Sequence, residues 1–438
     1  MLETIKKYKI FFLFFYLSLW SSLYSTGINR TFDIPLIVNR ICTVLVYSPF
    51  IASILWKLVQ DIRKMHFSFI NIAYYLFAIY FAGVTVYRFA TKQDPMDSIY
   101  FSLFLFGAIS MYLHVSCGKA AVTKAEYVKN FTAIGIYMVA FRLLHCLIGV
   151  HFLVDAPINV NITTGIVALI LPFLTNVLTD PETSRKQAVV LGLTIAGSII
   201  VICTAGSRAI FMLTMVILAA LFVRMCFSGK TALLRFLSVC LSAILVVTML
   251  AVLDVGRVRY SLSRQTSISF LISEDDKESP PLSVEDLEII EDQKDTTTIE
   301  AQTQINASDN MRRNLLNLGL DQVKKNPLFG TGDVLFPYVM SEDYIPTQSP
   351  HNFILETLIC YGIIGTLLLI VLCFALALHT RALSKNIPVG WRSKLSMLLT
   401  VGFFFGFGLV QPIMYNQFMC STFSILMSAF RLSLPEKK

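Results

Sequence analysis

The sequence predicts an all-α polytopic membrane protein with about twelve transmembrane helices. Of its 438 residues, 55% are apolar and only 15% are charged, whereas soluble domains carry about a quarter charged residues. Apolar runs of about 20 residues, each long enough to cross a bilayer, recur almost to the carboxyl end. An outer-membrane barrel is excluded because its strands alternate apolar and polar residues, whereas these runs are continuously apolar.

Hydropathy divides the chain into three regions. Residues 1–253 contain nine predicted transmembrane helices, residues 254–351 form a large loop, and residues 352–438 contain three more helices. The predicted helices are 9–26, 35–56, 67–90, 98–117, 131–154, 158–178, 187–204, 208–227, 232–253, 352–378, 393–411 and 414–432. The first is expected to be retained, because it lacks the small-residue cleavage site of a signal peptide.

The distribution of lysine and arginine predicts the orientation. With the amino terminus inside, 21 basic residues fall in the inside segments. The short outside connections hold four, which are Arg30, Arg88, Lys92 and Arg208. Basic residues favour the cytoplasmic side of a membrane, so both termini are expected there and the loop 254–351 is expected to be periplasmic.

The first parts of this loop differ in character. An acidic insertion over 274–300 has little to bury and is expected to be mobile and solvated. An amphipathic helix is predicted over 309–325, lying at the membrane interface. Its expected apolar stripe consists of Leu316, Leu320 and Val323, with Arg312 on the same face.

The loop then continues through a glycine-containing turn to a second polar junction. Gly330 and Gly332 allow a tight turn with exposed amide groups, which could hold an anion. The junction Ser349-Pro350-His351-Asn352 precedes the tenth predicted span. Because proline favours the start of a helix, His351 is expected in the first helical turn, at the outer surface.

Several arginines lie in or near the outer half of the predicted spans, where charges are costly and usually functional. They are Arg40, Arg142 and Arg208. The same spans offer few carboxylates, so an anionic phosphate or pyrophosphate ligand is favoured over internal ion pairs, which remain the alternative. The nine cysteines lie in or beside apolar runs and are interpreted as packing residues, and no metal site or cofactor is predicted.

Three motifs together resemble the O-antigen ligase family, which includes related O-antigen and capsule polymerases. They are Gly206-Ser207-Arg208-Ala209, Arg312 ahead of Asn326-Pro327-Leu328-Phe329-Gly330-Thr331-Gly332, and Ser349-Pro350-His351-Asn352 followed by Leu355-Glu356 and Gly362-Ile363-Ile364-Gly365. The resemblance covers roughly residues 200 to 378. It does not extend to the acidic insertion, which receives no role.

The resemblance implies a GT-C-like membrane glycosyltransferase of lipopolysaccharide biosynthesis. Such an enzyme moves a glycan from undecaprenyl pyrophosphate to a hydroxyl of the lipid A–core oligosaccharide, at the periplasmic face of the bacterial inner membrane. It is implied to be inverting and independent of metals and cofactors. Its partners would be donor, acceptor and bilayer, with no nucleic acid.

The resemblance also implies roles for individual residues. His351 corresponds to the general base, and Arg208 and Arg312 correspond to the arginines that hold the pyrophosphate. From their positions in the membrane, Arg142 and Arg40 are further candidates for that ligand. Supporting roles are expected for Asn352, Glu356, Gly330 and Gly332, although packing is an equal alternative for Glu356.

Two alternative functions remain. A polymerase would use a second carrier-linked glycan as acceptor; the ligase is favoured because the twelve-span layout and the Ser349–Asn352 junction look most like ligases. A lipid-linked glycan transporter would favour charges spread across the membrane and repeats with broken helices in both halves. The notable charges here favour the outer side, and no convincing repeat relates the two halves.

Overall fold

The computed structural model describes most of the chain as helix. The described residues are 36–64, 68–91, 96–117, 124–152, 160–253, 258–266, 312–334, 336–337, 347–384, 391–411 and 417–432. The long helices are α3 (Leu36–Lys64), α4 (Phe69–Ala90), α5 (Met96–Cys117), α6 (Lys124–Phe152), α7 (Val160–Leu178), α8 (Arg185–Thr204), α9 (Arg208–Cys226), α10 (Lys230–Val252), α14 (Phe353–Ser384), α15 (Trp391–Gly408) and α16 (Gln417–Leu432). Shorter elements are α11 (Val258–Thr266), a helix over 312–325, and the strands β1 (Phe336–Pro337) and β2 (Thr347–Gln348).

Each predicted transmembrane segment that falls within the described residues coincides with one of the long helices, to within several residues at each end. Within the described residues, five helices are long and apolar enough to cross a membrane: Phe69–Ala90, Arg185–Thr204, Arg208–Cys226, Lys230–Val252 and Phe353–Ala382. The chain is therefore a helical, multi-pass membrane protein. The total of twelve spans stays a prediction, and the expected helix 9–26 and the acidic insertion 274–300 lie outside the described residues.

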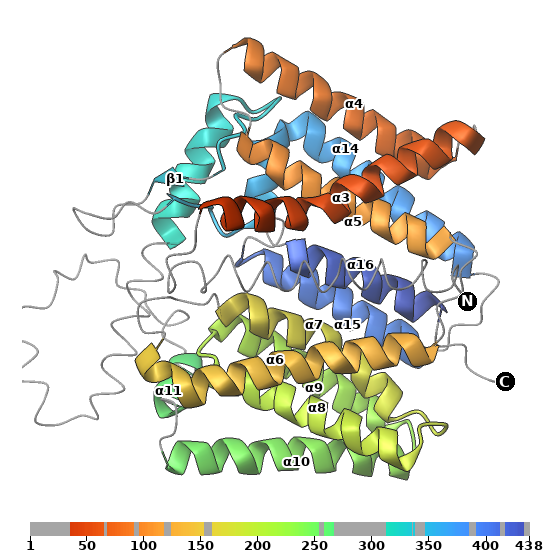
Figure 1. Cartoon of the computed structure of the whole chain (residues 1–438), viewed down its shortest axis with the longest axis vertical. Coiled ribbons are helices and arrows are strands. Elements are labelled where there is room, and N and C mark those ends of the chain that lie inside the picture. Colours follow the sequence, from red (N-terminus) through yellow and green to blue (C-terminus); the bar gives the residue numbers. More distant parts are fainter. Residues whose placement is uncertain are drawn as a thin grey trace, which may run out of the picture.

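The long helices form a bundle in which α15 and α16 lie between two groups (Figure 1). On one side α3 packs on α5 and α4 packs on α14, and on the other side α6 to α10 pack together. Helix α16 contacts both α5 and α7, so it links the groups. Helix α7 is fully buried over residues 166–170, as expected for a helix that is apolar on all sides.

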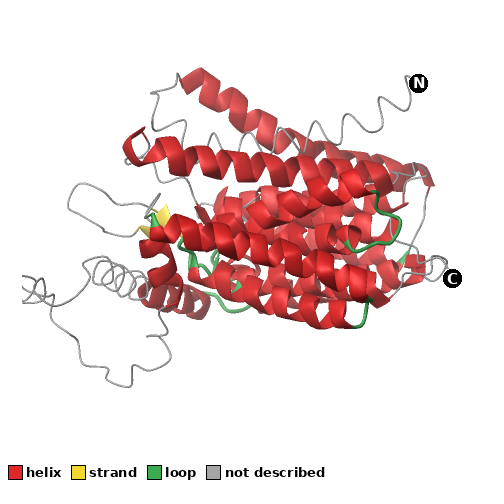
Figure 2. Ribbon diagram, turned by 90° about the horizontal axis from the view of Figure 1, so that it is seen from below, coloured by secondary structure: helices red, strands yellow, loops and turns green. Residues whose placement is uncertain are grey.

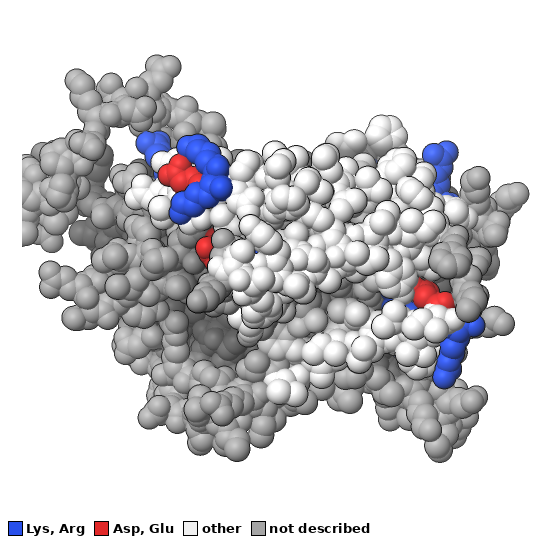
Figure 3. Space-filling model, turned by 90° about the horizontal axis from the view of Figure 1, so that it is seen from above, with Lys and Arg blue, Asp and Glu red and all other residues white. Residues whose placement is uncertain are grey.

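The lateral surface of the bundle is apolar. Figure 3 shows a broad surface free of charged residues, with Lys, Arg, Asp and Glu side chains near its two ends. On α10, for example, Leu241, Ile244 and Leu245 are all exposed. A soluble protein rarely exposes such extended apolar area, so this surface fits the hydrocarbon region of a bilayer.

One end of the bundle carries the short elements, and we call it the site end. The helix over 312–325, teal in Figure 1, and the strand pair lie there, beyond the long helices (Figures 1 and 2). The strands pair antiparallel, with Phe336 opposite Gln348.

The short helix α11 was not predicted from the sequence, because its residues are polar on average and it is only nine residues long. Its buried residues include Val258, Ser261 and Gln265, which share one helical face. The Gln265 side chain donates a hydrogen bond of 2.9 Å to the carbonyl oxygen of Ile202. Helix ends leave such carbonyl groups short of intrahelical partners, so α11 stabilises the end of α8.

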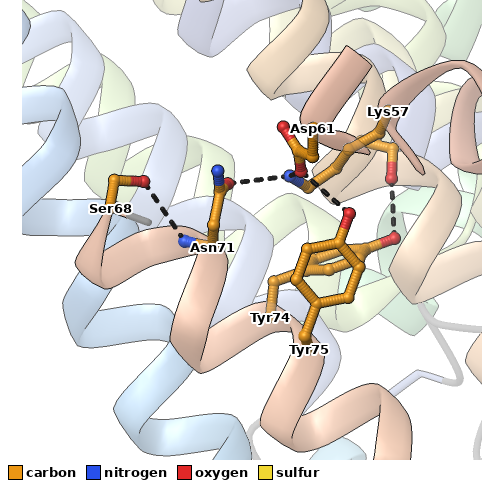
Figure 4. A network of polar contacts seen from close by, with 7 residues as sticks. Lys57, Asp61, Ser68, Asn71, Tyr74 and Tyr75 are labelled. Atoms are coloured by element: carbon orange, nitrogen blue, oxygen red, sulfur yellow. Dashed lines mark hydrogen bonds and ion pairs between the residues drawn. The ribbon is translucent and has the colours of Figure 1, made fainter. Parts of the chain in front are cut away.

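A buried polar network joins α3 to the first turns of α4 (Figure 4). Lys57 is almost fully buried, and its ammonium group donates to Asp61 (2.5 Å) and Asn71 (2.9 Å). It also lies 4.8 Å from the ring centre of Tyr74, while the Tyr75 hydroxyl donates to the same Asp61 carboxylate. These partners offset the cost of burying the charge.

Helix α14 is broken at Gly362, whose φ of 64° and ψ of −173° are not helical. A break in a membrane helix is tolerated only where other groups bond the freed backbone atoms. Here the carbonyl of Ile359 accepts a hydrogen bond from the Gly332 amide (3.0 Å). The carbonyl of Tyr361 accepts one from the Tyr80 hydroxyl of α4 (2.5 Å). The break is thus stabilised from two sides.

The amide groups beyond the break are also bonded. The Ile363 amide donates to the carbonyl of Pro327 (2.8 Å), and the Ile364 amide donates to that of Leu328 (3.2 Å). The turn over 326–332 therefore docks directly into the break of α14. This contact connects the end of the helix over 312–325 to the membrane-spanning helix that follows His351.

We expect Gly362→Ala to destabilise the protein strongly. A Cβ at this position would lie 2.2 Å from the carbonyl oxygen of Leu328, and the backbone conformation alone costs a non-glycine residue about 1–3 kcal/mol. Gly83→Ala is the matched control, because its Cβ would meet nothing within 4 Å. The Tm in detergent should fall clearly for Gly362→Ala only; equal Tm values for the two variants would contradict the geometry.

Candidate active site

His351 lies two residues before α14, and its backbone has a positive φ of 54°. The expectation that Pro350 starts the helix and His351 lies in its first turn was wrong. Instead Asn352 caps α14, because its side-chain oxygen accepts a hydrogen bond from the Leu355 amide (3.1 Å). His351 is thereby placed outside the helix, in a conformation that helical residues do not adopt.

Two side chains anchor the backbone around His351. The His351 amide donates to the hydroxyl oxygen of Ser349 (3.4 Å), and the Asn352 side-chain amide donates to the carbonyl of Leu409, just after α15 (3.4 Å). A positive φ in a non-glycine residue costs free energy and persists only when the surroundings hold it. Such strained residues cluster at functional sites, which makes His351 a candidate on geometry as well as on chemistry.

The imidazole of His351 meets groups from two other elements. Burial lowers the pKa of His351 from its usual 6.5 to about 4, and the positive charge of Arg312 lowers it as well. A hydrogen bond with the side chain of Gln411, which follows α15, acts in the opposite direction. His351 is therefore neutral at pH 7 and able to accept a proton. Sequence reasoning brought Arg312 and His351 into one site but missed Gln411.

The helix over 312–325 packs on the rest of the structure through a face beside its predicted apolar stripe. Leu315 is fully buried and Gly319 is buried, whereas Leu316 and Leu320 are 38% and 45% exposed. Of the predicted stripe, only Val323 packs against the core. Exposure of Leu316 and Leu320 fits the membrane-interface position expected for this helix, which stays a prediction.

Gly319 explains how this helix comes close to α14. A Cβ at Gly319 would lie 2.6 Å from the Leu355 side chain and 3.2 Å from the Pro350 ring. A larger residue at this position would require the Leu355 side chain to move. Because Arg312 is seven residues from Gly319, it lies on about the same helical face. The contact therefore turns Arg312 toward the segment that carries His351.

The turn over 326–332 binds a cation rather than an anion. The Gly330 amide donates to the Asn326 carbonyl (2.8 Å) and the Gly332 amide donates to Ile359, so neither amide is available to hold an anion. Instead, the guanidinium of Arg88 donates to the carbonyls of this turn. The anion-binding interpretation of the two glycines is corrected accordingly: they permit the close approach of backbone and guanidinium.

Arg88 is the principal residue that sequence reasoning missed. It was counted in an outside connection, whereas the structure places it in the last turn of α4, almost fully buried. Its Nη2 atom donates to the carbonyls of Phe329 (3.0 Å), Gly330 (3.1 Å) and Cys360 (2.7 Å), and its Nη1 atom donates to the Ser98 hydroxyl (2.9 Å). The sequence signal was a single arginine at the end of an apolar stretch. This signal does not identify the carbonyl acceptors of Arg88, because they lie far along the chain.

The other predicted arginines occupy three helices. Arg208 begins α9, directly after the end of α8, and is half-buried. Arg40 lies in α3 and Arg142 lies in α6, but the side chains of both are outside the described part of the structure. Their expected roles toward a pyrophosphate are therefore predictions.

Glu356 lies one turn into α14, directly after the Asn352 cap, and is fully buried. Its carboxyl group lies beside the Ser349 hydroxyl but accepts no well-formed hydrogen bond from the described residues. A buried acid next to the His351 segment fits a supporting role. Across the described ranges, no three His, Cys, Asp or Glu side chains gather in a way that could hold a metal ion.

Comparison with known proteins identifies one family. Residues 193–370, about two fifths of the chain, match the family model described as O-antigen ligase, and the resemblance inferred from the motifs is thereby confirmed. Neither the curated proteins nor the solved structures contain a significant match. The family match indicates an O-antigen ligase or polymerase type of function in polysaccharide synthesis, and hence a glycosyltransferase-like enzyme.

Proposed function

We propose that this protein is an O-antigen ligase that transfers a glycan from undecaprenyl pyrophosphate to a hydroxyl group of lipid A–core oligosaccharide. The observation that supports the proposal best is the packing of the helix that carries Arg312, through Gly319, against the segment that carries His351. The Arg312 charge is close enough to lower the pKa of His351, and both residues lie within the matched residues 193–370. A neutral imidazole can accept a proton, and a guanidinium group is suited to a pyrophosphate. This reaction needs both groups in one place.

In the proposed reaction, His351 is the general base. The acceptor hydroxyl gives its proton to the imidazole as its oxygen attacks the anomeric carbon of the donor glycan. The bond between that carbon and the pyrophosphate oxygen breaks, and the electron pair leaves with the pyrophosphate. Attack and departure on opposite faces invert the anomeric configuration. Fixed guanidinium groups stabilise the charge that develops on the leaving group.

The proposed arrangement of charges follows from the arginines. Arg312 and Arg208 would hold the pyrophosphate, with Arg142 and Arg40 as further candidates. The proposed reaction uses no metal and no cofactor, because these cations take the role of a divalent ion. Asn352 and Glu356 would support the base, since Asn352 caps α14 and Glu356 lies beside Ser349.

We further propose twelve transmembrane spans in the bacterial inner membrane, with both termini cytoplasmic and the site end periplasmic. The excess of lysine and arginine in the expected inside segments supports this orientation. The donor's polyprenyl tail would remain in the bilayer beside the apolar lateral surface.

A reconstituted reaction tests the proposal. Purified protein would be incubated with undecaprenyl-pyrophosphate-linked glycan and lipid A–core in the presence of EDTA, and products would be separated on a gel. Glycan joined to lipid A–core is the expected result and would establish a metal-independent ligase. Longer carrier-linked chains with untouched lipid A–core would instead identify a polymerase. No product, beside an active ligase as control, would reject both and favour a transporter.

A further inference from the structure

We propose that Arg88 is a positioning residue for this reaction, because it joins the helix that carries Arg312 to the helix that follows His351. The inference rests on the proposed function. It assigns a role to a residue of α4, which lies outside the matched stretch 193–370. This role is to hold other segments in place, not to contact the substrate.

The contacts of Arg88 bridge two segments that are separate in the chain. One nitrogen, Nη2, donates to Phe329 and Gly330, which follow the helix over 312–325, and to Cys360 in α14. Phe329 and Gly330 belong to the turn at the helix end, and Cys360 lies just before the break at Gly362. Backbone carbonyls at helix ends carry partial negative charge, which favours a cation there.

Burial indicates that stability alone does not explain this arginine. Arg88 is only 1% exposed, and removal of a guanidinium group from water has a large cost in free energy. Apolar residues of similar volume often give equal or greater stability at such positions. What an apolar side chain cannot do is fix two carbonyl-bearing segments relative to one another.

Arg88 is linked to the helix that carries Arg312 through the turn that follows this helix. Gly332 is so close that a Cβ there would lie 2.6 Å from Nη1 of Arg88. The helix over 312–325 thus meets α14 twice: through Gly319 at its middle and through the Arg88-bound turn at its end. If Arg88 were lost, the second contact would loosen, and the helix could shift Arg312 away from His351.

Hydrogen exchange tests the structural half of the proposal without any substrate. In Arg88→Gln, backbone amides of residues 312–334 should exchange on the order of tenfold faster or more, because the turn at the end of this helix loses the charged donor that bonds its carbonyls. The matched control is Arg224→Gln in α9, equally buried and bonded to Ser396 and Asn176. That variant should leave exchange in 312–334 unchanged.

Kinetics test the catalytic half. A displacement of about 1 Å near a reacting centre can cost about 100-fold in rate, so kcat of Arg88→Gln should fall by that order. The fall of kcat/KM at acid pH, which we call its acid limb, should also move to higher pH, because the charge of Arg312 moves away from His351. The groups acting on His351 are Arg312 from its helix and the neutral Gln411 after α15; Glu356 of α14 lies nearby.

The outcomes separate the two proposals. If hydrogen exchange in 312–334 is unchanged in Arg88→Gln, the proposed role of Arg88 is wrong whatever the activity. The role is also wrong if exchange is faster but kcat and the pH profile are unchanged. If the unaltered protein transfers no glycan, the proposed function fails while the exchange data still report on the Arg88 contacts. If Arg88→Gln does not fold, two other variants test the same contact. Gly332→Ala displaces the guanidinium, and Arg88→Lys keeps the positive charge. We expect Arg88→Lys to recover part of the protection from hydrogen exchange and part of kcat.

Discussion

His351→Asn should abolish glycan transfer while the protein accumulates in the membrane at a normal level. Loss of a general base costs about 10²–10⁴-fold in rate. The fold should survive, because asparagine tolerates the positive φ of 54° that position 351 adopts better than most residues. The measurement is kcat in the reconstituted reaction beside the amount of protein in membranes. Nearly full activity of this variant would show that His351 is not the base.

The pH profile of the unaltered protein gives a second expected result for His351. Only the neutral imidazole accepts a proton, and the pKa of about 4 in the unliganded protein keeps it neutral above that pH. The rate constant kcat/KM for the donor, which reports the free enzyme, should therefore stay constant from neutral pH to about pH 5 and fall near pH 4. A fall centred near 6.5 would contradict the burial of His351 beside Arg312.

The fall of kcat at acid pH should occur at a higher pH than the fall of kcat/KM. The bound donor brings the negative charge of its pyrophosphate to Arg312, which offsets the positive charge that lowers the pKa of His351. Since kcat reports the enzyme–substrate complex, the difference between the two limbs measures this effect. Coincident limbs would indicate that the pyrophosphate does not bind near Arg312.

The helices were predictable from the sequence because a continuous apolar run of about 20 residues is typical of a membrane helix. α8 and α9, for example, begin within two residues of their predicted starts. The short helix α11 was not predictable in this way, since its stability comes from tertiary contacts such as that between Gln265 and Ile202.

The packing face of the helix over 312–325 shows why the site was only partly predictable. The apolar stripe predicts that Leu316 and Leu320 face the membrane interface, but it does not identify the face that packs on the rest of the protein. In a membrane protein, leucines can face lipid, and close helix contacts are made by small residues. The contact is therefore made at Gly319, against Leu355. The order of Arg312 and His351 along the chain was informative, but their proximity depends on that glycine.

Arg312→Ala and Arg312→Lys should both lose transfer, yet they should differ in pH dependence. In the proposed reaction the Arg312 guanidinium contacts the pyrophosphate at two points, which lysine cannot reproduce. We therefore expect kcat to fall about 10²–10³-fold in both variants, as for loss of one donor to a developing oxyanion. Lysine keeps a positive charge near His351 and should leave the acid limb of kcat/KM near pH 4. Alanine removes that charge, so the pKa of His351 rises and the limb moves to higher pH.

Arg313→Ala is the matched control for these variants, because Arg313 is the next residue on the same helix and its side chain is exposed. It should retain both rate and pH profile. The comparison separates two effects of Arg312 that a single substitution combines: binding of the leaving group and control of the base. If the lysine variant transferred glycan at the full rate, a point charge would suffice and the two-point contact with pyrophosphate would be wrong. If the alanine variant kept its acid limb near pH 4, burial alone would set the protonation of His351, and the helix over 312–325 would act on the donor only.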